Sequence, residues 1–322
     1  MKTIRWGIIG VGDVCEVKSG PGFQKAENSA LVAVMRRDAA KAQDFAERHQ
    51  VPRWYDQAED FINDPEVDAV YIATPPHVHK RYTLMAAEAG KPVFVEKPMA
   101  INFEECQAMV DACNNAGVPL WVAYYRRCLP KFRKIKALVD SGAIGQVRTV
   151  SITLRANKTT GPQETWRVNT DVSGGGHFVD VGVHSLDYLD YLLGPIAKVS
   201  GYALNQGGHY AAVDNVVASF VFESGVTGTG SWCFTSEAAT DDTVITGTKG
   251  ILRYATFTGD PIVLTTASGE ESIPVEWPAH VHQNLIQTIV DELNGQGQSP
   301  STGESGARTT WVTDQILQST SS

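Results

Sequence analysis

The sequence predicts an α/β fold in which an N-terminal doubly wound parallel sheet is followed by an α+β domain with a large, mostly antiparallel, open-faced sheet. Two observations support this prediction. Up to residue 123, short apolar runs alternate with amphipathic stretches, which is typical of a parallel α/β sheet. From residue 124 onward, two helical patterns precede a long strand-rich stretch. At 322 residues the chain is long enough for two hydrophobic cores, so we expect domains at 1–123 and 124–322.

The elements of the first domain follow one another in a regular order. We expect strands at 3–9, 30–35, 68–73, 92–95 and 118–123 and helices at 38–49, 56–63, 77–89 and 102–116. The strand segments LVAVM, VDAVYIA and PVFVE are nearly all apolar, as expected for strands that helices cover on both faces. Asp38 and Asn102 are expected to cap helix N-termini, and Gly90 and Gly117 to end helices.

The second domain is expected to be α+β. Helical patterns at 131–140 and 177–193 precede a strand-rich stretch at 197–277. Within that stretch, a Glu-Ser-Gly turn separates two runs of β-branched and aromatic residues, as in an antiparallel hairpin. Two helices, at 280–294 and 303–318, should close the chain. An antiparallel sheet with one uncovered face favours a homodimer or homotetramer.

Composition and charge favour a small-molecule substrate as the partner. The chain is 43% hydrophobic and 20% charged, near the globular average. Its formal charge of -9, without a long Lys/Arg run, argues against binding to nucleic acid or to a membrane surface. The five cysteines are odd in number and lack a CxxC spacing, which indicates a reducing compartment. Since the N-terminal apolar run stops at Asp13 and no stretch could span a bilayer, we expect a cytoplasmic protein.

A glycine-rich turn follows the first strand. The strand Ile4–Ile9 runs into Gly10 and Gly12, where the lack of a Cβ permits a tight turn and lets the backbone approach a pyrophosphate. We therefore predict a Rossmann-type unit that binds a nicotinamide dinucleotide, against the alternative of a purely structural turn. Cys15 replaces the third glycine of the usual fingerprint, and residues 19–22 interrupt the first helix.

The end of the second strand indicates which dinucleotide is preferred. Sites specific for NAD usually have Asp or Glu here to bind the ribose 2′-hydroxyl, whereas this chain has Arg36 and Arg37. Because a guanidinium pairs well with a phosphate, we predict NADP, with NAD possible as the cofactor. Asp38 could compete as a ribose ligand but is better explained as a helix cap. In the alternative interpretation, both arginines are simply solvated.

Three further motifs follow predicted strands or open a predicted helix. Thr74-Pro75-Pro76-His77-Val78-His79 ends one strand, Glu96-Lys97-Pro98 ends the next, and GGGxxxDxGxH begins at Gly174. Together they resemble the Gfo/Idh/MocA family of sugar and polyol oxidoreductases along essentially the whole chain. Pro76 departs from the family pattern, which usually has Asn there. The resemblance implies hydride transfer on CH-OH or carbonyl groups with NAD(P) and without a metal.

Lys97 is the first predicted catalytic residue. It sits at the carboxyl end of a parallel strand, where open α/β sheets bind ligands. Burial disfavours a lysine ammonium, which lets it exchange a proton with a hydroxyl or carbonyl. The alternative is a lysine that pairs with Glu96 or with a phosphate. The resemblance makes Lys97 catalytic and implies a cis peptide bond between Lys97 and Pro98. The residues assigned to the cofactor are Gly10, Gly12, Asp13, Val14, Arg36, Arg37, Thr74, Pro75, His79, Glu96 and Lys97.

Asp180 and His184 complete the predicted catalytic set. Their spacing of four residues puts both side chains on one helical face, where a carboxylate can orient an imidazole or both can reach one substrate. Histidine suits proton transfer near neutral pH, and the family pattern carries catalysis onto these positions. A structural His–Asp pair is the alternative. His177, Asp180, His184 and Asp187 also permit a zinc interpretation, but no nearby cysteine or HExxH pattern supports it, so we predict no metal.

Two further segments are expected to contact the substrate. Aromatic faces and guanidinium donors suit a polyhydroxylated ligand, and they occur at Tyr124-Tyr125-Arg126-Arg127 and at Trp166-Arg167. An interdomain salt bridge is the alternative for Arg126 or Arg127. The residues assigned to the substrate are Tyr125, Arg126, Trp166, Arg167 and His184.

The sequence therefore predicts an NAD(P)-dependent oxidoreductase that acts on a sugar, an inositol or a related carbonyl or alcohol. Lys97 and His184 form its proton relay, and Asp180 orients the substrate or the relay. Two alternatives stay open. One is a dehydrogenase of the dihydrodiol type or for another non-sugar, and the other is a non-catalytic NADP-binding regulator.

Overall fold

The computed structural model describes residues 1–159 and 165–319, which form two units. Unit 1 comprises Met1–Cys128 and Pro278–Ala307, and unit 2 comprises Leu129–Trp277 and Arg308–Ser322. The units therefore differ from the two continuous ranges expected, 1–123 and 124–322. The physical reason is that a late segment of the chain returns to the first sheet, where Thr302 forms a β-bridge with Trp121.

Unit 1 contains a parallel sheet with the strand order β3-β2-β1-β4-β5-β6. Its strands are β1 (Ile4–Ile9), β2 (Ser29–Met35), β3 (Arg53–Tyr55), β4 (Ala69–Ile72), β5 (Val93–Val95) and β6 (Leu120–Val122). Its helices include α1 (Asp13–Val17), α2 (Gly20–Lys25), α3 (Ala39–Arg48), α4 (Ala58–Ile62), α5 (His79–Glu88), α6 (Phe103–Ala116) and α10 (Gln283–Leu293). Strands β4, β5 and β6 are buried along their whole length, which confirms the prediction of strands covered on both faces.

Local sequence signals explain the helix ends of this unit. The side chains of Asp38 and Asn102 accept hydrogen bonds from the backbone N–H groups of Lys41 and Glu105, which confirms both predicted caps. The first helix is broken into α1 and α2 at the predicted interruption. The short edge strand β3 was not predicted, because its sequence RWY is too short to show an alternating pattern.

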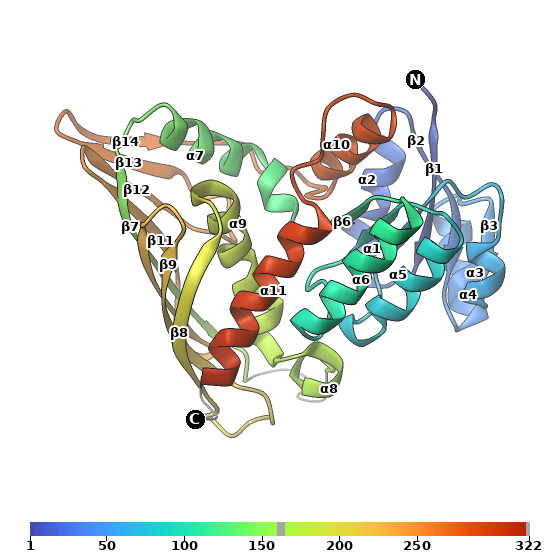
Figure 1. Ribbon diagram of the computed structural model, residues 1–322, viewed down its shortest axis with the longest axis horizontal. Helices are drawn as coiled ribbons and strands as arrows, with labels where there is room; N and C mark the ends of the chain where they lie inside the picture. Colours follow the sequence, from blue (N-terminus) through green and yellow to red (C-terminus); the bar gives the residue numbers. More distant parts are fainter. Residues whose placement is uncertain (160–164, 320–322) are drawn as a thin grey trace. The chain divides into compact units, whose positions relative to one another are not determined.

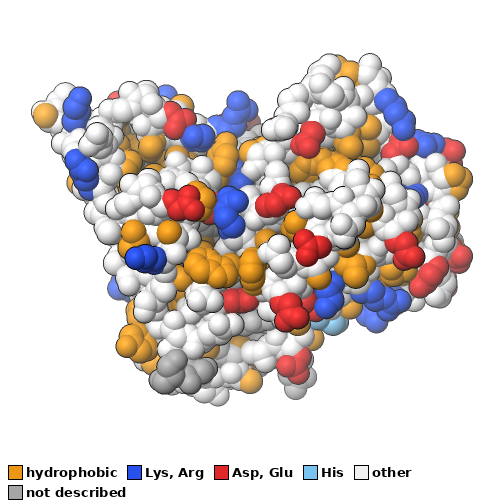
Figure 2. Space-filling model, viewed as in Figure 1, with side chains coloured by type: hydrophobic (Ala, Val, Ile, Leu, Met, Phe, Trp, Pro, Cys, Tyr) orange, Lys and Arg blue, Asp and Glu red, His pale blue; other side chains and the backbone are white. Residues whose placement is uncertain are grey.

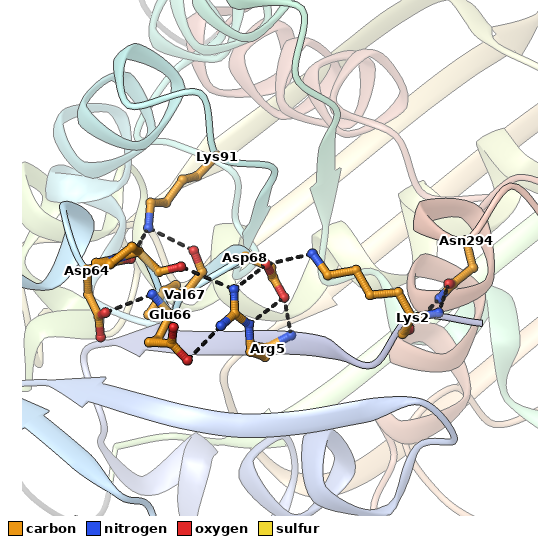
Figure 3. A network of polar contacts seen from close by, with 9 residues as sticks. Lys2, Arg5, Asp64, Glu66, Val67, Asp68, Lys91 and Asn294 are labelled. Carbon is orange, nitrogen blue, oxygen red and sulfur yellow. Dashed lines mark hydrogen bonds and ion pairs between the residues drawn. The ribbon is translucent and has the colours of Figure 1, made fainter.

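An ion-pair network holds the amino ends of β1 and β4 together (Figure 3). Arg5 of β1 bonds to Asp68 at 2.9 Å and to Glu66 at 2.7 Å, and Lys2 bonds to Asp68 at 2.8 Å. Burial opposes the charge on Asp68, but the hydrogen bonds from Arg5 and Lys2 hold its pKa well below the ordinary value. Lys91 donates to the carbonyl oxygens of residues 64 and 67 in the same turn. This network lies at the end of the sheet opposite to the predicted cofactor site.

Unit 2 contains a sheet with the order β14-β13-β12-β11-β7-β10-β9-β8 (Figure 1). Its strands are β7 (Val147–Asn157), β8 (Ile196–Leu204), β9 (Asn215–Phe222), β10 (Thr227–Cys233), β11 (Thr235–Gly247), β12 (Gly250–Tyr254), β13 (Ile262–Thr266) and β14 (Gly269–Ile273). Only the β7–β10 pair among these neighbours is parallel, so the predicted mostly antiparallel sheet is confirmed for the described residues. Strand β7 was not predicted, although it lies in the middle of the sheet.

Helices cover one face of this second sheet. The helical segments are α7 (Pro130–Asp140), η3 (Trp166–Val168), α8 (Thr170–Ser173), η4 (Phe178–Gly182), α9 (Val183–Leu193) and α11 (Gly303–Gln318), of which α11 belongs to unit 2 from Arg308 on. The rings of Phe132 in α7 and Tyr188 in α9 both contact Tyr254 of β12. The opposite face carries Tyr202 and Val217, which are 66% and 44% exposed. The two faces of the sheet are therefore built differently.

The surface mixes charges of both signs. On the face shown in Figure 2, Lys and Arg side chains are interspersed with Asp and Glu. Within the described residues, none of the helices combines the length and the apolar composition that crossing a membrane requires.

Candidate active site

The turn after β1 has the geometry expected of a dinucleotide loop. Gly10 adopts a φ of +92°, and a Cβ there would lie 2.6 Å from the Thr74 side chain, so only glycine fits. Gly12 is the N-cap of α1, and a Cβ placed on it would have nothing within 4 Å. From the end of β2, Arg36 donates a 2.8 Å hydrogen bond to the Val11 carbonyl. The loop is thus held in place from both neighbouring strands and leaves open space at Gly12.

Cys15 occupies the third position of the glycine fingerprint and is completely buried. Its Sγ lies 3.7 Å from the Ser19 hydroxyl and 4.0 Å from the Gly10 carbonyl. Burial raises the pKa of Cys15 to about 12, so the thiol keeps its proton. Cys15 therefore acts as a small apolar side chain that fills space beneath the loop.

An unsatisfied hydroxyl lies beside the same loop. Thr74, directly after β4, has a buried Oγ1 with no hydrogen-bond partner among the described residues. Since buried polar atoms are normally paired, this hydroxyl indicates a place for a hydrogen-bonding ligand. Together with the open space at Gly12, it makes the carboxyl edge of the sheet fit a dinucleotide.

The two predicted arginines differ in their surroundings. Arg36 is half-buried and holds the loop through Val11, whereas Arg37 is exposed. Asp38, the competing ribose ligand, accepts the backbone N–H of Lys41 at 3.2 Å. That hydrogen bond holds the pKa of Asp38 below its ordinary value, as expected of a helix-capping carboxylate.

His79 links the two motifs that end β4 and β5. Its ring is fully buried, with Nε2 2.7 Å from the Thr74 carbonyl and Nδ1 3.1 Å from the carbonyls of Pro98 and Met99. Burial lowers the pKa of His79. The Lys97–Pro98 peptide bond is cis, as the resemblance implies. The contacts of both ring nitrogens with the backbone mean that His79 positions Thr74 and the segment after Lys97.

Glu96 is a buried carboxylate with donors from three parts of the chain. Its Oε1 accepts from the Tyr71 hydroxyl at 2.6 Å and lies 2.8 Å from Nε2 of His282, and its Oε2 accepts the Lys97 backbone N–H at 3.0 Å. Burial opposes the charge, yet the hydrogen bond and charge of His282, aided by the charge of Lys97 and the hydroxyl of Tyr71, lower the pKa of Glu96 to about 2. Lys97 itself is half-buried. Glu96 is therefore a charged group directly beside the predicted catalytic lysine.

Sequence reasoning did not predict Tyr71 or His282. The one signal for Tyr71 was a hydroxyl in an otherwise apolar strand, and His282 lies in a loop that precedes α10. The 186 residues between Glu96 and His282 explain why spacing could not pair them.

The aromatic and basic segment after β6 is buried in unit 1. The Tyr125 ring lies 4.5 Å from that of His282, and the Arg126 guanidinium lies 5.0 Å over the Tyr125 ring. Arg127 donates to the Pro300 carbonyl. Two predicted substrate residues, Tyr125 and Arg126, are thus brought together next to an unpredicted histidine.

In unit 2, three predicted residues meet at one point. The Arg167 guanidinium stacks 4.5 Å over the Trp166 ring, and its Nε lies 3.0 Å from the Asp180 carboxylate. The expected continuous helix at 177–193 instead begins with the π-helical turn η4, which contains Asp180, and continues as α9. Such widened turns often occur at functional sites. The structure therefore joins the Trp166-Arg167 motif to the Asp180 carboxylate, which the sequence predicts to be catalytic.

His184 is buried in the first turn of α9. Its ring lies 5.8 Å from that of Phe257. The loop that carries Phe257 is held on two sides: the Asp241 carboxylate accepts the backbone N–H groups of Thr256 and Phe257, and Lys131 donates to the carbonyls of residues 255 and 258. A long-range loop therefore forms one wall of the histidine's surroundings.

His177 and Asp187, the other two residues considered as zinc ligands, make other contacts. The His177 ring packs near Tyr210 and Phe234, and the fully buried Asp187 accepts a hydrogen bond from Thr309. Over the described ranges, no three His, Cys, Asp or Glu side chains are grouped as a metal ion would require.

Comparison with known proteins places the chain in a family. An oxidoreductase-family model with an NAD-binding Rossmann fold matches residues 4–124, and a GFO/IDH/MocA C-terminal domain model matches residues 132–253. The chain belongs to the Gfo/Idh/MocA family. It is therefore an oxidoreductase with an NAD-binding Rossmann unit, which confirms the predicted family, fold class and enzyme class.

Relatives of this Gfo/Idh/MocA oxidoreductase match it over nearly its whole length. Oxidoreductase P35 of Formosa agariphila is 38% identical over 97% of both chains. The 1,5-anhydro-D-fructose reductase of Ensifer adhaerens is 29% identical over 94% of this chain and 92% of its own. The crystal structure of aldose-aldose oxidoreductase from Caulobacter crescentus, complexed with glycerol, is 27% identical with a TM-score of 0.88 and covers 99% of this chain and 98% of its own.

Proposed function

We propose that this oxidoreductase transfers a hydride between a nicotinamide cofactor, with NADP preferred over NAD, and a sugar, an inositol or a related carbonyl or alcohol. The observation that carries the proposal is Lys97, half-buried at the carboxyl end of β5 and directly beside the charged Glu96. The relationship to an anhydrofructose reductase supports a carbohydrate-like substrate.

The cofactor residues of the proposal lie along the carboxyl edge of the first sheet. The loop Gly10–Val14 offers backbone N–H groups for a pyrophosphate, and the unpaired Thr74 hydroxyl offers a hydrogen bond. Arg36 and Arg37 would neutralise a 2′-phosphate. Pro75 and His79 shape the turn behind Thr74. When bound, the nicotinamide supplies or accepts the hydride.

The proton relay of the proposal uses Lys97 and His184. In the direction of reduction, the Lys97 ammonium or His184 donates a proton to the substrate oxygen, and in the reverse direction it accepts that proton. Asp180, fixed by Arg167, orients the substrate or the relay. Trp166, Tyr125 and Arg126 would contact a polyhydroxylated ligand through aromatic faces and guanidinium donors.

The proposal includes a homodimer or homotetramer in the cytoplasm. The proposed assembly rests on apolar side chains of the second sheet that are exposed in the single chain: Tyr202, Leu204, Val217 and Ile251. Light scattering on the purified protein measures the assembly mass, and a monomer would contradict this part of the proposal.

A substrate panel tests the proposed reaction. Sugars, inositols and 2-keto sugars are followed at the nicotinamide absorbance with NADP(H) and with NAD(H), for the wild type, Lys97→Ala and His184→Ala. We expect kcat to fall by about a thousandfold in Lys97→Ala and about a hundredfold in His184→Ala, since a positioned proton donor contributes about 10²–10⁴-fold.

Lys80→Ala is the matched control because its ammonium pairs with Glu105 on the helices of unit 1, and it should keep wild-type turnover. If Lys97→Ala kept wild-type turnover, the relay would be wrong. If NAD outperformed NADP, the argument from Arg36 and Arg37 would fail.

A further inference from the structure

The buried cluster around Glu96 reaches beyond the residues used in the proposed reaction. Tyr71 comes from the middle of the first sheet, and His282 comes from the segment that returns to unit 1 near the end of the chain. Both bond to Oε1 of Glu96, at 2.6 Å and 2.8 Å, while Oε2 accepts the Lys97 N–H. The orientation of this carboxylate is therefore set by its neighbours.

The protonation states in the cluster follow from its geometry. Burial raises the pKa of Tyr71 well above its ordinary value, so its hydroxyl keeps the proton and donates to Glu96. Because a carboxylate oxygen only accepts, Nε2 of His282 must carry a proton. Nδ1 of His282 is buried and has no hydrogen-bond partner within the described part of the chain. Within the described residues, the His282 ring therefore makes its polar contact through Nε2, with Glu96.

The ring of each residue is also held by packing. The Tyr71 ring lies 4.8 Å from Phe94 and 5.1 Å from Phe23, and the His282 ring lies 4.5 Å from Tyr125. Each ring therefore has packing contacts in addition to its hydrogen bond. Removal of the Tyr71 hydroxyl should therefore change the polar contact and leave the packing intact.

We infer that Tyr71 and His282 are positioning residues, which hold the Glu96 carboxylate in one orientation so that its Oε2 bond to the Lys97 N–H keeps the lysine correctly placed. The inference rests on the proposed role of Lys97. The Oε2 bond fixes the backbone from which the lysine side chain extends, and the buried carboxylate that accepts this bond is charged. Tyr71 and His282 do not touch the substrate in this scheme.

Four variants separate a positioning role from a structural one. Glu96→Gln removes the charge, Tyr71→Phe removes one donor, His282→Leu removes the other, and His282→Gln keeps a side-chain donor. The matched control is Tyr55→Phe, because Tyr55 also donates to a carboxylate, that of Asp64 at 3.0 Å, in the same unit but on the edge strand β3, which β2 and β1 separate from β4. The measurements are kcat and KM, and the rate at which an acylating reagent modifies Lys97 at one mildly alkaline pH, followed by peptide mass spectrometry.

We expect Tyr71→Phe and His282→Leu to lower kcat by about tenfold with KM little changed, since a lost hydrogen bond to a charged group is worth about that factor. His282→Gln should restore kcat to within about threefold of the wild type. Glu96→Gln should raise the rate at which Lys97 is acylated, because the lysine is no longer held in one position by the fixed carboxylate. Tyr55→Phe should change neither measurement.

The inference is overturned if Tyr71→Phe matches Tyr55→Phe in kcat, if His282→Gln is as impaired as His282→Leu, or if Glu96→Gln leaves the acylation of Lys97 unchanged. These outcomes leave the proposed function intact as long as Lys97→Ala loses activity. If the wild type turned over nothing in the panel, the proposed function would fail, and the acylation rate alone would decide whether Glu96 controls the lysine.

Discussion

The two units hold their candidate site residues by different means. In unit 1, Thr74, Glu96 and Lys97 directly follow β4 and β5, and parallel strands bring such positions to one edge of the sheet. In unit 2, Asp180 lies in a π-helical turn and is fixed by Arg167, while the loop 255–258 reaches His184 from a distant part of the chain. The candidate residues of unit 1 thus depend on strand topology, and those of unit 2 depend on individual long-range contacts.

This difference predicts different sensitivities to substitution. The candidate residues of unit 1 follow strands that are wholly buried. We therefore expect the loss of a single polar contact to affect one side chain there and not the sheet. In unit 2, the ion pair of Asp180 with Arg167 is partly exposed, with 44% of the Arg167 side chain accessible. Substitutions in unit 2 should therefore affect the substrate and leave cofactor binding unchanged.

Among the substitutions that test this difference between the units, Asp180→Asn should have the largest effect. Loss of the carboxylate charge releases Arg167, and we expect kcat/KM to fall by about a hundredfold, as for a residue that orients a proton relay. The Kd of the reduced cofactor, measured by nicotinamide fluorescence, should not change. Asp171→Asn, an exposed aspartate in the neighbouring α8, is the control. If Asp180→Asn lost cofactor affinity to the same extent, the expectation that unit 2 affects the substrate and not the cofactor would be wrong.

A smaller effect is expected for Lys131→Met in α7. The buried ammonium donates to the carbonyls of Ala255 and Thr258, and its removal leaves both without that donor. We expect the free energy of unfolding to fall by about 2 kcal/mol, the usual cost of buried groups left unpaired. Urea denaturation followed by tryptophan fluorescence measures it. Lys136→Met, whose ammonium pairs with Asp140 on the same helix, should cost about 0.5 kcal/mol or less, and similar losses would contradict the role of Lys131.

The smallest effect is expected at a helix cap of unit 1. The Asn102 side chain accepts the Glu105 N–H at 2.8 Å, and Asn102→Ala should lower the free energy of unfolding by about 1 kcal/mol without a change in kcat. The same denaturation experiment measures it. Asn114→Ala, an exposed position near the end of the same helix, should be neutral or slightly stabilising. A change in kcat in Asn102→Ala would mean that this cap also supports the site.

Whether a candidate site residue could be predicted from the sequence also depends on whether a local motif or a long-range contact fixes it. The turn at Gly10 and the caps at Asp38 and Asn102 could be predicted because each depends on a motif a few residues long, whereas the catalytic role of Lys97 stays a prediction. The partners of Glu96 could not, since Tyr71 and His282 carry no periodic or motif signal. The π-helical turn at Asp180 was missed because a spacing of four residues suits an α-helix equally well.

Local periodicity and short motifs were enough to predict most strands and helices of unit 1, the two-part α/β and α+β character, and the family, but not the short strand β3. Only the tertiary structure decided the place of β7 between β10 and β11, the return of residues 278–307 to unit 1, and the cluster around Glu96. The physical reason is that strand pairing and buried hydrogen bonds join residues far apart in the chain, whose association is favoured by burial rather than by any pattern between neighbours.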